Sequence, residues 1–411
     1  GDVCDTDIDG DGVLNDVDNC PTVANGPSIE GTTVAGGNGQ GSASNQFNRP
    51  KGIVFDASGN MYISDKNNNR IQKWSPGASE GTTVAGGNGN GSAANQLDQP
   101  IGIALDASGN LYIADRKNNR IQKWAPGASE GITVAGGNSS GSAVNQLNQP
   151  SGITLDASGN LYIADKDNHR IQKWAPGASE GTTVAGGNGS GSATNQLNQP
   201  SGVFLDSDVN LYISDTYNHR IQKWGSGASE GTTVAGGNGQ GSATNQFNKP
   251  KGINIDASGN LYIADKDNHR IQKWESGASE GTTIAGGNGQ SSELNALNNP
   301  KGITLDTSGN LYIVDSYNNR IQKWTLGQWD NDGDGIGDAC DNCPSTPTGE
   351  TVNEKGCSDS QKDTDNDGVT DDLDLCPSTP TGETVDTNGC SDSQKDTDND
   401  GVTDDVDECP S

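Results

Sequence analysis

Short apolar runs separated by polar, glycine-rich turns recur throughout the middle of the chain. In the first copy they are GIVFD (52–56), MYISD (61–65), RIQKW (70–74) and GTTVAGG (81–87). The segment ASGN is a tight-turn signal between the first two runs, and KNNN and SPGASE separate the others. Each run has the length and composition of a short strand, so the pattern predicts four strands per copy.

The copies follow one another with a fixed period of 50 residues, and a proline precedes the first strand of each copy. These prolines are Pro50, Pro100, Pro150, Pro200, Pro250 and Pro300. Four short strands in a repeat of about 40–50 residues are typical of one blade of a β-propeller. The predicted fold is therefore all-β, a six-bladed propeller with four strands in each blade.

The first and last copies predict how the ring closes. GTTVAGG occurs once before the first copy, at 31–37, and no such run follows RIQKW at 320–324. A strand near residues 32–36 would complete the sixth blade beside 320–324. This closure would remove the two exposed sheet edges that an open array leaves.

The repeated unit resembles the NHL repeat. The shared pattern is P-x-G-I-x-x-D-x-x-G-N-L-Y-I-A-D-x-x-N-H-R-I-Q-K, matched about six times over residues 30–327. The resemblance implies a six-bladed β-propeller. A tryptophan at the end of each third strand departs from the family pattern, and we expect it to pack between neighbouring blades. These residues are Trp74, Trp124, Trp174, Trp224, Trp274 and Trp324.

Composition supports a chain of short strands flanked by something different. Of 411 residues, 29% are hydrophobic, 5% are aromatic and 59 are glycine, which argues against a large helical core. Residues 31–327 hold 23 acidic and 22 basic residues, whereas the flanks hold 32 acidic and three basic ones. No apolar run approaches the ~18 residues of a membrane span. The chain opens on GDVC, in the middle of a motif, so we expect a slice or a mature product.

The acidic flanks contain four twelve-residue segments in one frame, beginning at residues 7, 330, 363 and 396. Carboxylates stand at positions 1, 3 and 5, glycine at 6, and further oxygen ligands at 9 and 12. Calcium takes about six to eight oxygen ligands, and glycine at position 6 permits a sharp turn around the ion. EF-hands share this spacing but need flanking helices, and the Cys-Pro that follows each loop opposes a helix there. The predicted ligands are Asp7, Asp9, Asp11, Asn15, Asp18, Asp330, Asp332, Asp334, Asp338, Asp341, Asp363, Asp365, Asp367, Asp371, Asp374, Asp396, Asp398, Asp400, Asp404 and Asp407.

These loops resemble thrombospondin type 3 repeats over about residues 1–29 and 328–411, with the propeller at 30–327. The resemblance implies that calcium and disulfides replace an apolar core. In this family DNCP is followed at once by a second acidic half, which here is GQWDNDGDGIGDAC, ending at Cys340. The propeller therefore looks inserted within one repeat, and the resemblance implies a Cys20–Cys340 bond across it. Adjacent chain ends make such an insertion favourable.

The remaining cysteines also lie in the flanks, and their even number suggests disulfides and an extracellular or cell-surface protein. CPSTPTGETVNEKGC (343–357) and CPSTPTGETVDTNGC (376–390) repeat each other, so we pair Cys343 with Cys357 and Cys376 with Cys390. Cys4 and Cys409 are left over. Either the chain is part of a longer array of repeats that contains the partners of Cys4 and Cys409, or these ends meet neighbouring copies in a filament.

The sequence favours a protein that is not an enzyme. Propeller lyases and lactonases gather unlike residues from different blades, whereas these blades are nearly identical. His169, His219 and His269 share one repeat position with asparagines of other blades, so we expect a structural role. RNA binding needs a basic face, which the net charge of −30 opposes, although Lys51, Lys66, Arg116 and Lys117 could form a local patch.

The blades differ mainly in the turn after the second strand and around the prolines. Loops carry function on a rigid scaffold, which makes Tyr217 and Tyr317 candidates for contacts with a glycan or protein. The expected function is a calcium-stabilised structural or adhesion protein, such as a subunit of a filament or surface fibre. A glycan- or protein-binding module is the second reading, a lyase or lactonase the third. Neutral drift among duplicated blades would explain the same differences.

Overall fold

The structure is a computed structural model that describes residues 31–326, 343, 346–347, 349–353, 357–371, 373–376, 378–397 and 403. One compact unit spans Ile29–Trp324, and the described residues from 343 onward belong to another. The regular elements described in the first unit are all short strands or single 3₁₀ turns, joined by loops. No helix in the described ranges is long and apolar enough to cross a membrane.

Strands form where the apolar runs predict them. The strands are β1 (Thr32–Gly36), β2 (Ile53–Phe55), β3 (Met61–Asp65), β4 (Arg70–Trp74), β5 (Thr82–Gly86), β6 (Pro100–Leu105), β7 (Leu111–Asp115), β8 (Arg120–Trp124), β9 (Ile132–Gly136), β10 (Pro150–Leu155), β11 (Leu161–Asp165), β12 (Arg170–Trp174), β13 (Thr182–Gly186), β14 (Val203–Leu205), β15 (Leu211–Asp215), β16 (Arg220–Trp224), β17 (Thr232–Gly236), β18 (Pro250–Ile255), β19 (Leu261–Asp265), β20 (Arg270–Trp274), β21 (Thr282–Gly286), β22 (Pro300–Leu305), β23 (Leu311–Asp315) and β24 (Arg320–Trp324). The 3₁₀ turns are η1 (Lys66–Asn68), η2 (Arg116–Asn118), η3 (Lys166–Asn168), η4 (Thr216–Asn218) and η5 (Lys266–Asn268).

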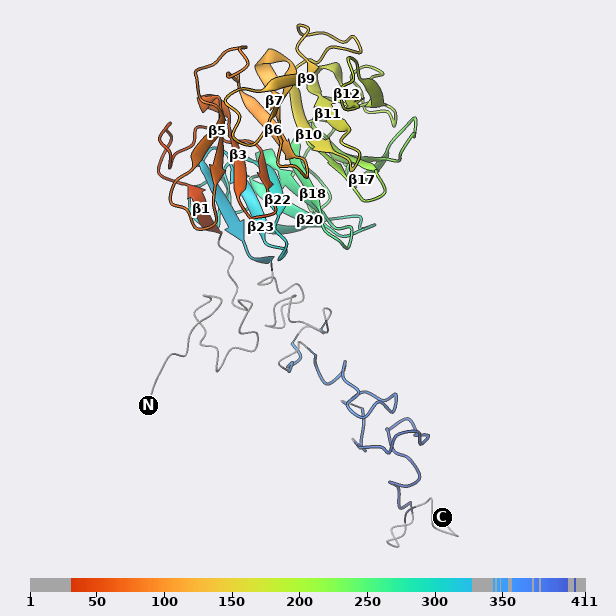
Figure 1. Cartoon of the computed structure of the whole chain (residues 1–411). Helices are drawn as coiled ribbons and strands as arrows, with labels where there is room; N and C mark the ends of the chain where they lie inside the picture. Colours follow the sequence, from red (N-terminus) through yellow and green to blue (C-terminus); the bar gives the residue numbers. More distant parts are fainter. Residues whose placement is uncertain are drawn as a thin grey trace, which may run out of the picture. The chain divides into compact units, whose positions relative to one another are not determined.

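The 24 strands form six four-stranded sheets, each a meander of antiparallel neighbours. Five sheets take four consecutive strands, and the sixth has the order β1-β24-β23-β22 (Figure 1). Thr32 pairs with Lys323 and Gly36 with Arg320, so the N-terminal strand completes the last blade. The predicted six-bladed, ring-closed propeller is confirmed.

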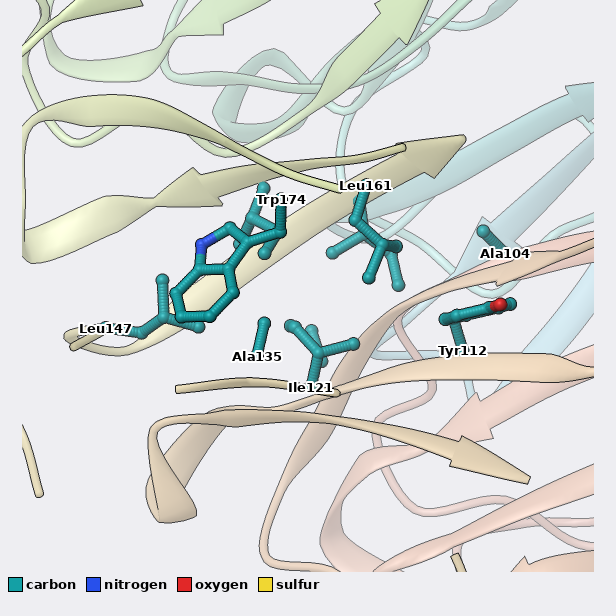
Figure 2. Close-up of a cluster of buried hydrophobic side chains, with 10 residues drawn as sticks. Ala104, Tyr112, Ile121, Ala135, Leu147, Leu161 and Trp174 are labelled. Carbon is teal, nitrogen blue, oxygen red and sulfur yellow. The ribbon is translucent and has the colours of Figure 1, made fainter. Parts of the chain in front are cut away.

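The core lies between blades. Trp174 of β12 packs against Ile121 of β8, Ala135 of β9 and Leu147, all from the preceding blade (Figure 2). The six tryptophans of the third strands are at most 5% exposed. The glycine before each fourth strand leaves room for the indole: a Cβ on Gly181 would lie 2.2 Å from Nε1 of Trp174. Burial of these apolar side chains between blades therefore stabilises the propeller.

A buried carboxylate at the end of each second strand organises the turn that follows. In the third blade Asp165 accepts hydrogen bonds from the backbone N–H of Asn148 and from the side chains of Asn168 and Arg170. Burial raises the pKa of Asp165, and these hydrogen bonds oppose that rise. The same three donors serve the equivalent aspartate in every blade, which explains why Asp, Asn and Arg recur together.

The second unit has little apolar core in its described residues. Cys343 is bonded to Cys357 and Cys376 to Cys390, the two pairs expected from the repeated sequence. In the second of these loops, Oε1 of Gln394 accepts hydrogen bonds from Thr379 and from the backbone N–H of Ser391. The first loop repeats this network around Gln361. Small disulfide-closed units with polar interiors therefore replace a hydrophobic core.

Candidate metal centre and ligand-binding face

Three predicted calcium ligands come together in the second unit. Asp363, Asp365 and Asp367 each offer a carboxylate oxygen, and these oxygens lie within 4.8 Å of one another. Gly368, at the sixth position, has φ +97°, a conformation that only glycine adopts readily. Its N–H and that of Asp367 both donate to Asp363. The local sequence thus folds the loop so that its first three acidic positions converge.

The donor set fits a hard divalent cation. Oδ1 of Asp365 and Oδ2 of Asp367 are buried and have no hydrogen-bond partner among the described residues. A Cβ on Gly389 would lie 2.0 Å from Oδ1 of Asp374 and 3.2 Å from Oδ2 of Asp367, so these two carboxylates share one small cradle. Buried, unpaired carboxylate oxygens are unfavourable without a compensating charge. Calcium, with oxygen ligands in flexible geometry, would supply that charge.

The last two positions of this loop are engaged differently. Oδ1 of Asp371 accepts from the backbone N–H of Thr364 and its Oδ2 from the Thr364 hydroxyl, and these hydrogen bonds lower the pKa of Asp371. Oδ1 of Asp374 accepts from the N–H of Cys376, and both residues lie outside the three-aspartate group. Of the last predicted loop, only the first ligand, Asp396, lies within the described residues. The other predicted ligands, and Cys4, Cys20, Cys340 and Cys409, lie outside the described residues.

In the propeller, six X-Gly pairs at the start of the first strands surround the central channel. A Cβ on Gly102 would lie 2.2 Å from the carbonyl oxygen of Ser151 in the next blade, and Gly302 approaches the carbonyl of Lys51 in the same way. The N–H of Gly302 also donates to Lys51 at 2.9 Å. Close backbone approach therefore explains the glycine of the P-X-G motif, and the ring it forms is continuous.

The X residues differ around this ring. Three neighbouring blades place Lys251, Lys301 and Lys51 there, and the other three place Ile101, Ser151 and Ser201. Together with the glycines they line a depression of about 110 Å³. All three lysines are half-buried. The sequence prediction included Lys51 but not Lys251 or Lys301, although variation around the prolines was the signal that could have identified them.

Burial and mutual repulsion act on these ammonium groups. Desolvation, followed by the charges of Lys266 and Lys166, lowers the pKa of Lys251 to about 7. Burial lowers the pKa of Lys51 and of Lys301 well below the usual lysine value. Nearby positive charge adds to this: Lys66, Arg49 and Lys251 act on Lys51, and Lys51 and Lys251 act on Lys301. This half of the channel mouth therefore holds cationic groups in an environment that disfavours their charge.

The two predicted ligand-binding tyrosines each follow a residue that contacts a lysine of this ring: Thr216 accepts from Lys251 and Ser316 accepts from Lys51. Tyr217 and Tyr317 are 46% and 43% exposed. The guanidinium of Arg49 lies 4.7 Å from the ring centroid of Tyr317, and Nζ of Lys51 lies 5.8 Å from it. Nζ of Lys249 lies 5.7 Å from the ring centroid of Tyr217. Both tyrosines thus combine an accessible aromatic face with nearby positive charge.

The three histidines have a structural partner. His169, His219 and His269 have φ of +54°, and Nδ1 of each accepts the backbone N–H of the residue before the next blade's proline. In the other blades an asparagine Oδ1 accepts the equivalent N–H, as Asn69 does from Gln99. Burial lowers the pKa of His219 and His269, which favours the neutral, accepting ring. Each histidine therefore joins two blades.

Two family models match different parts of the chain. Residues 47–74, 97–124, 147–174, 197–224, 247–274 and 297–324 match the NHL repeat. Residues 1–27, 328–350, 356–383 and 386–411 match the thrombospondin type 3 repeat. No curated protein matches the chain.

Solved structures resemble the propeller at low sequence identity. A protein of unknown function from Bacteroides thetaiotaomicron has a TM-score of 0.57 at 18% identity, covering 72% of this chain and 75% of that one. An auxiliary nutrient binding protein from the same organism has a TM-score of 0.54 at 16% identity, covering 71% and 75%. A gluconolactonase from Xanthomonas campestris has a TM-score of 0.51 at 16% identity, covering 68% and 86%. At these identities the likeness extends to the fold alone.

Proposed function

We propose that this protein is an extracellular, calcium-stabilised structural or adhesion protein without enzymatic activity. The proposal starts from its two kinds of repeat, the NHL repeats of the propeller and the thrombospondin type 3 repeats of the flanks. The observation that carries the proposal is the pair of buried, unpartnered oxygens on Asp365 and Asp367, inside a unit that disulfides close. Calcium bound there would neutralise repelling carboxylates and stiffen the repeats.

The proposed organisation places the propeller, residues 30–327, inside one thrombospondin type 3 repeat that residues 1–29 begin and residues 328–411 continue. A Cys20–Cys340 bond is part of this proposal. A non-reducing peptide map would detect the cross-linked pair of peptides. Cys4 bonded to Cys20 instead would contradict the insertion.

The test of the calcium role is a comparison of the secreted chain with calcium and with chelator. We expect the second unit to become sensitive to protease and the hydrodynamic radius to change on chelation, while the propeller stays intact. Asp365→Ala should lower calcium affinity because it removes a ligand of the three-aspartate group. Asp392→Ala is the matched control, since its side chain is 75% exposed and makes only a surface ion pair at 3.6 Å. Equal behaviour of wild type with and without calcium would refute the proposal.

A second candidate function is recognition of a glycan or protein by the propeller. Its support is the concave channel mouth with two accessible tyrosines, on a scaffold whose other positions repeat almost unchanged. Immobilised glycans and surface proteins, probed with the purified chain in calcium, would test it. Self-association into filaments is a further possibility of the first proposal, which electron microscopy of the secreted material would reveal.

A further inference from the structure

The lysines and arginines of the propeller fall into two groups. Of the 22 between residues 31 and 326, twelve belong to the RIQKW strand of the six copies. All six arginines of that strand pair with the buried aspartate of their own blade at 2.7–2.9 Å. Four of the six lysines pair with the aspartate of the first turn at 3.6–3.9 Å. The repeated cations are thus part of the scaffold.

The other ten cations do not repeat in every blade. They are Arg49, Lys51, Lys66, Arg116, Lys117, Lys166, Lys249, Lys251, Lys266 and Lys301. All ten stand either beside the proline of the first strand or in the turn after the second strand. Backbone hydrogen bonds join these two segments within a blade: the N–H of Lys117 donates to Asp98 and that of Tyr317 to Asn298. The ten cations therefore share one end of the propeller, around the channel mouth.

Few acidic groups balance them there. The same segments contain only Asp98, Asp167 and Asp267 as additional carboxylates. Asp267 pairs with Lys266 and Lys249, and Asp167 pairs with Lys166. One end of a nearly neutral propeller thus carries a concentrated positive charge, on a chain whose net charge is −30.

Two of the three lysines of the X-Gly ring donate to hydroxyl groups rather than to carboxylates. Lys51 donates to the Ser316 hydroxyl at 2.9 Å and Lys251 to the Thr216 hydroxyl at 3.4 Å. Within the described ranges none of the three forms an ion pair. Burial first, and the charge of neighbouring cations second, lowers the pKa of each lysine, and an anion beside the ammonium groups would offset both effects.

We propose that this half of the channel mouth binds an acidic polysaccharide, with a carboxylate or sulfate group held by Lys51, Lys251 and Lys301 and sugar rings packed on Tyr317 and Tyr217. The proposal rests on the propeller being a recognition module and names its ligand class. Charge-assisted hydrogen bonds from several ammonium groups suit such an anion. An accessible aromatic face suits the apolar face of a pyranose ring.

The arrangement favours a saccharide over a nucleic acid. Nucleic-acid grooves track a backbone with an extended line of cations. Here three of the ten cations, Lys51, Lys251 and Lys301, line one half of a depression of about 110 Å³, which is compact rather than extended. Arg49 lies near the ring of Tyr317 and Lys249 near the ring of Tyr217. A saccharide could therefore place an uncharged sugar ring on a tyrosine while its anionic group contacts the neighbouring cations.

The test measures binding of the full chain, in calcium, to a galacturonic acid oligomer, to sulfated dextran and to unsulfated dextran. We expect saturable binding of at least one acidic probe and no binding of unsulfated dextran. Preference for the galacturonic acid oligomer would identify a carboxylate as the bound group, and preference for sulfated dextran would identify a sulfate. The variant K251S/K301S introduces the serine found at 151 and 201, so it should fold normally. Affinity should fall roughly tenfold or more per lysine.

Two controls keep the test specific. The variant K273S/K323S removes the same charge from third strands, where each lysine lies opposite a tyrosine in the sheet register, and should bind as wild type. Tyr317→Ala should weaken the saccharides while leaving inorganic sulfate binding unchanged. Binding of a neutral glycan unaffected by K251S/K301S would overturn this inference but keep the recognition function. If a single-stranded RNA oligomer bound more tightly than the acidic saccharides, the proposed ligand class would be wrong. If no probe bound, both the ligand class and the recognition function would be refuted.

Discussion

The hydrogen bond from Lys249 to His219 offers a direct test of how neighbouring blades are joined. Nδ1 of His219 accepts the N–H of Lys249 at 3.2 Å, and both residues are half-buried. His219→Ala removes the acceptor and leaves that N–H partly desolvated, which costs about 1 kcal/mol, because an unmade buried hydrogen bond costs ~1–3 kcal/mol and water can reach this one. The three histidines act on different neighbouring blades, so a triple alanine variant should lose about 3 kcal/mol.

The chain supplies its own control for this experiment. Asparagine occupies the same position in three blades, and Asn119 accepts the N–H of Gln149 at 2.9 Å. Replacing all three histidines by asparagine should therefore change the free energy of unfolding by less than about 0.5 kcal/mol at pH 7. Urea unfolding followed by tryptophan fluorescence reports on the propeller, because the six tryptophans of its third strands are buried between blades.

Acid should separate the histidine and asparagine forms. The pKa of His219 and of His269 is lowered in the folded state, so the unfolded chain takes up protons first as the pH falls. Stability should decline below about pH 6.5, the ordinary histidine pKa, and the triple asparagine variant should lack that part of the decline. The reasoning is refuted if asparagine destabilises as much as alanine, or if the alanine variant matches wild type.

Three further predictions follow from the contacts described above. Asp165→Asn leaves the buried Arg170 without its charge partner at 2.7 Å and should lower the free energy of unfolding by about 3–5 kcal/mol in a urea titration. Gly181→Ala places a methyl group 2.2 Å from the Trp174 ring and should destabilise by about 1–3 kcal/mol, whereas Gly225→Ala, which copies Ala125 and Ala175, should be neutral. Affinity for an acidic probe should fall between pH 6 and pH 8 in binding titrations, because Lys251, with a pKa of about 7 beside Lys166 and Lys266, loses its charge there; constant affinity would exclude Lys251 from the site.

Most of the propeller could be predicted from sequence because each blade repeats the same signals. The strands β3 (Met61–Asp65) and β4 (Arg70–Trp74) coincide with the apolar runs, and β1 (Thr32–Gly36) lies where ring closure required it. The first-strand prediction, 52–56, was too long by one residue at each end. Asp56 accepts hydrogen bonds from the turn at Asn60, so its side chain and backbone end the strand.

The functional candidates were harder to predict because they depend on positions that differ between blades. Spacing within one loop identified Asp363, Asp365 and Asp367, since their convergence is local. Lys251 and Lys301 stand on consecutive blades, and Lys51, which is 200 and 250 residues away from them in sequence, joins them only through ring closure between the sixth and first blades. A periodic pattern hides such a site, because it directs attention to what the copies share.

Replacing all three ring lysines by serine, the residue found at 151 and 201, separates stability from binding. The folded-state pKa of each ring lysine lies below the ordinary value of about 10.5, so folding disfavours the charged form and stability rises as the pH increases from about 7 towards 10.5. The triple variant K51S/K251S/K301S should therefore be more stable than wild type at pH 7, and this advantage should shrink at pH 10. It should also lose affinity for acidic saccharides. Lysines kept against stability are expected where a ligand supplies the compensating charge. A triple variant less stable than wild type at pH 7 would show instead that the lysines belong to the scaffold.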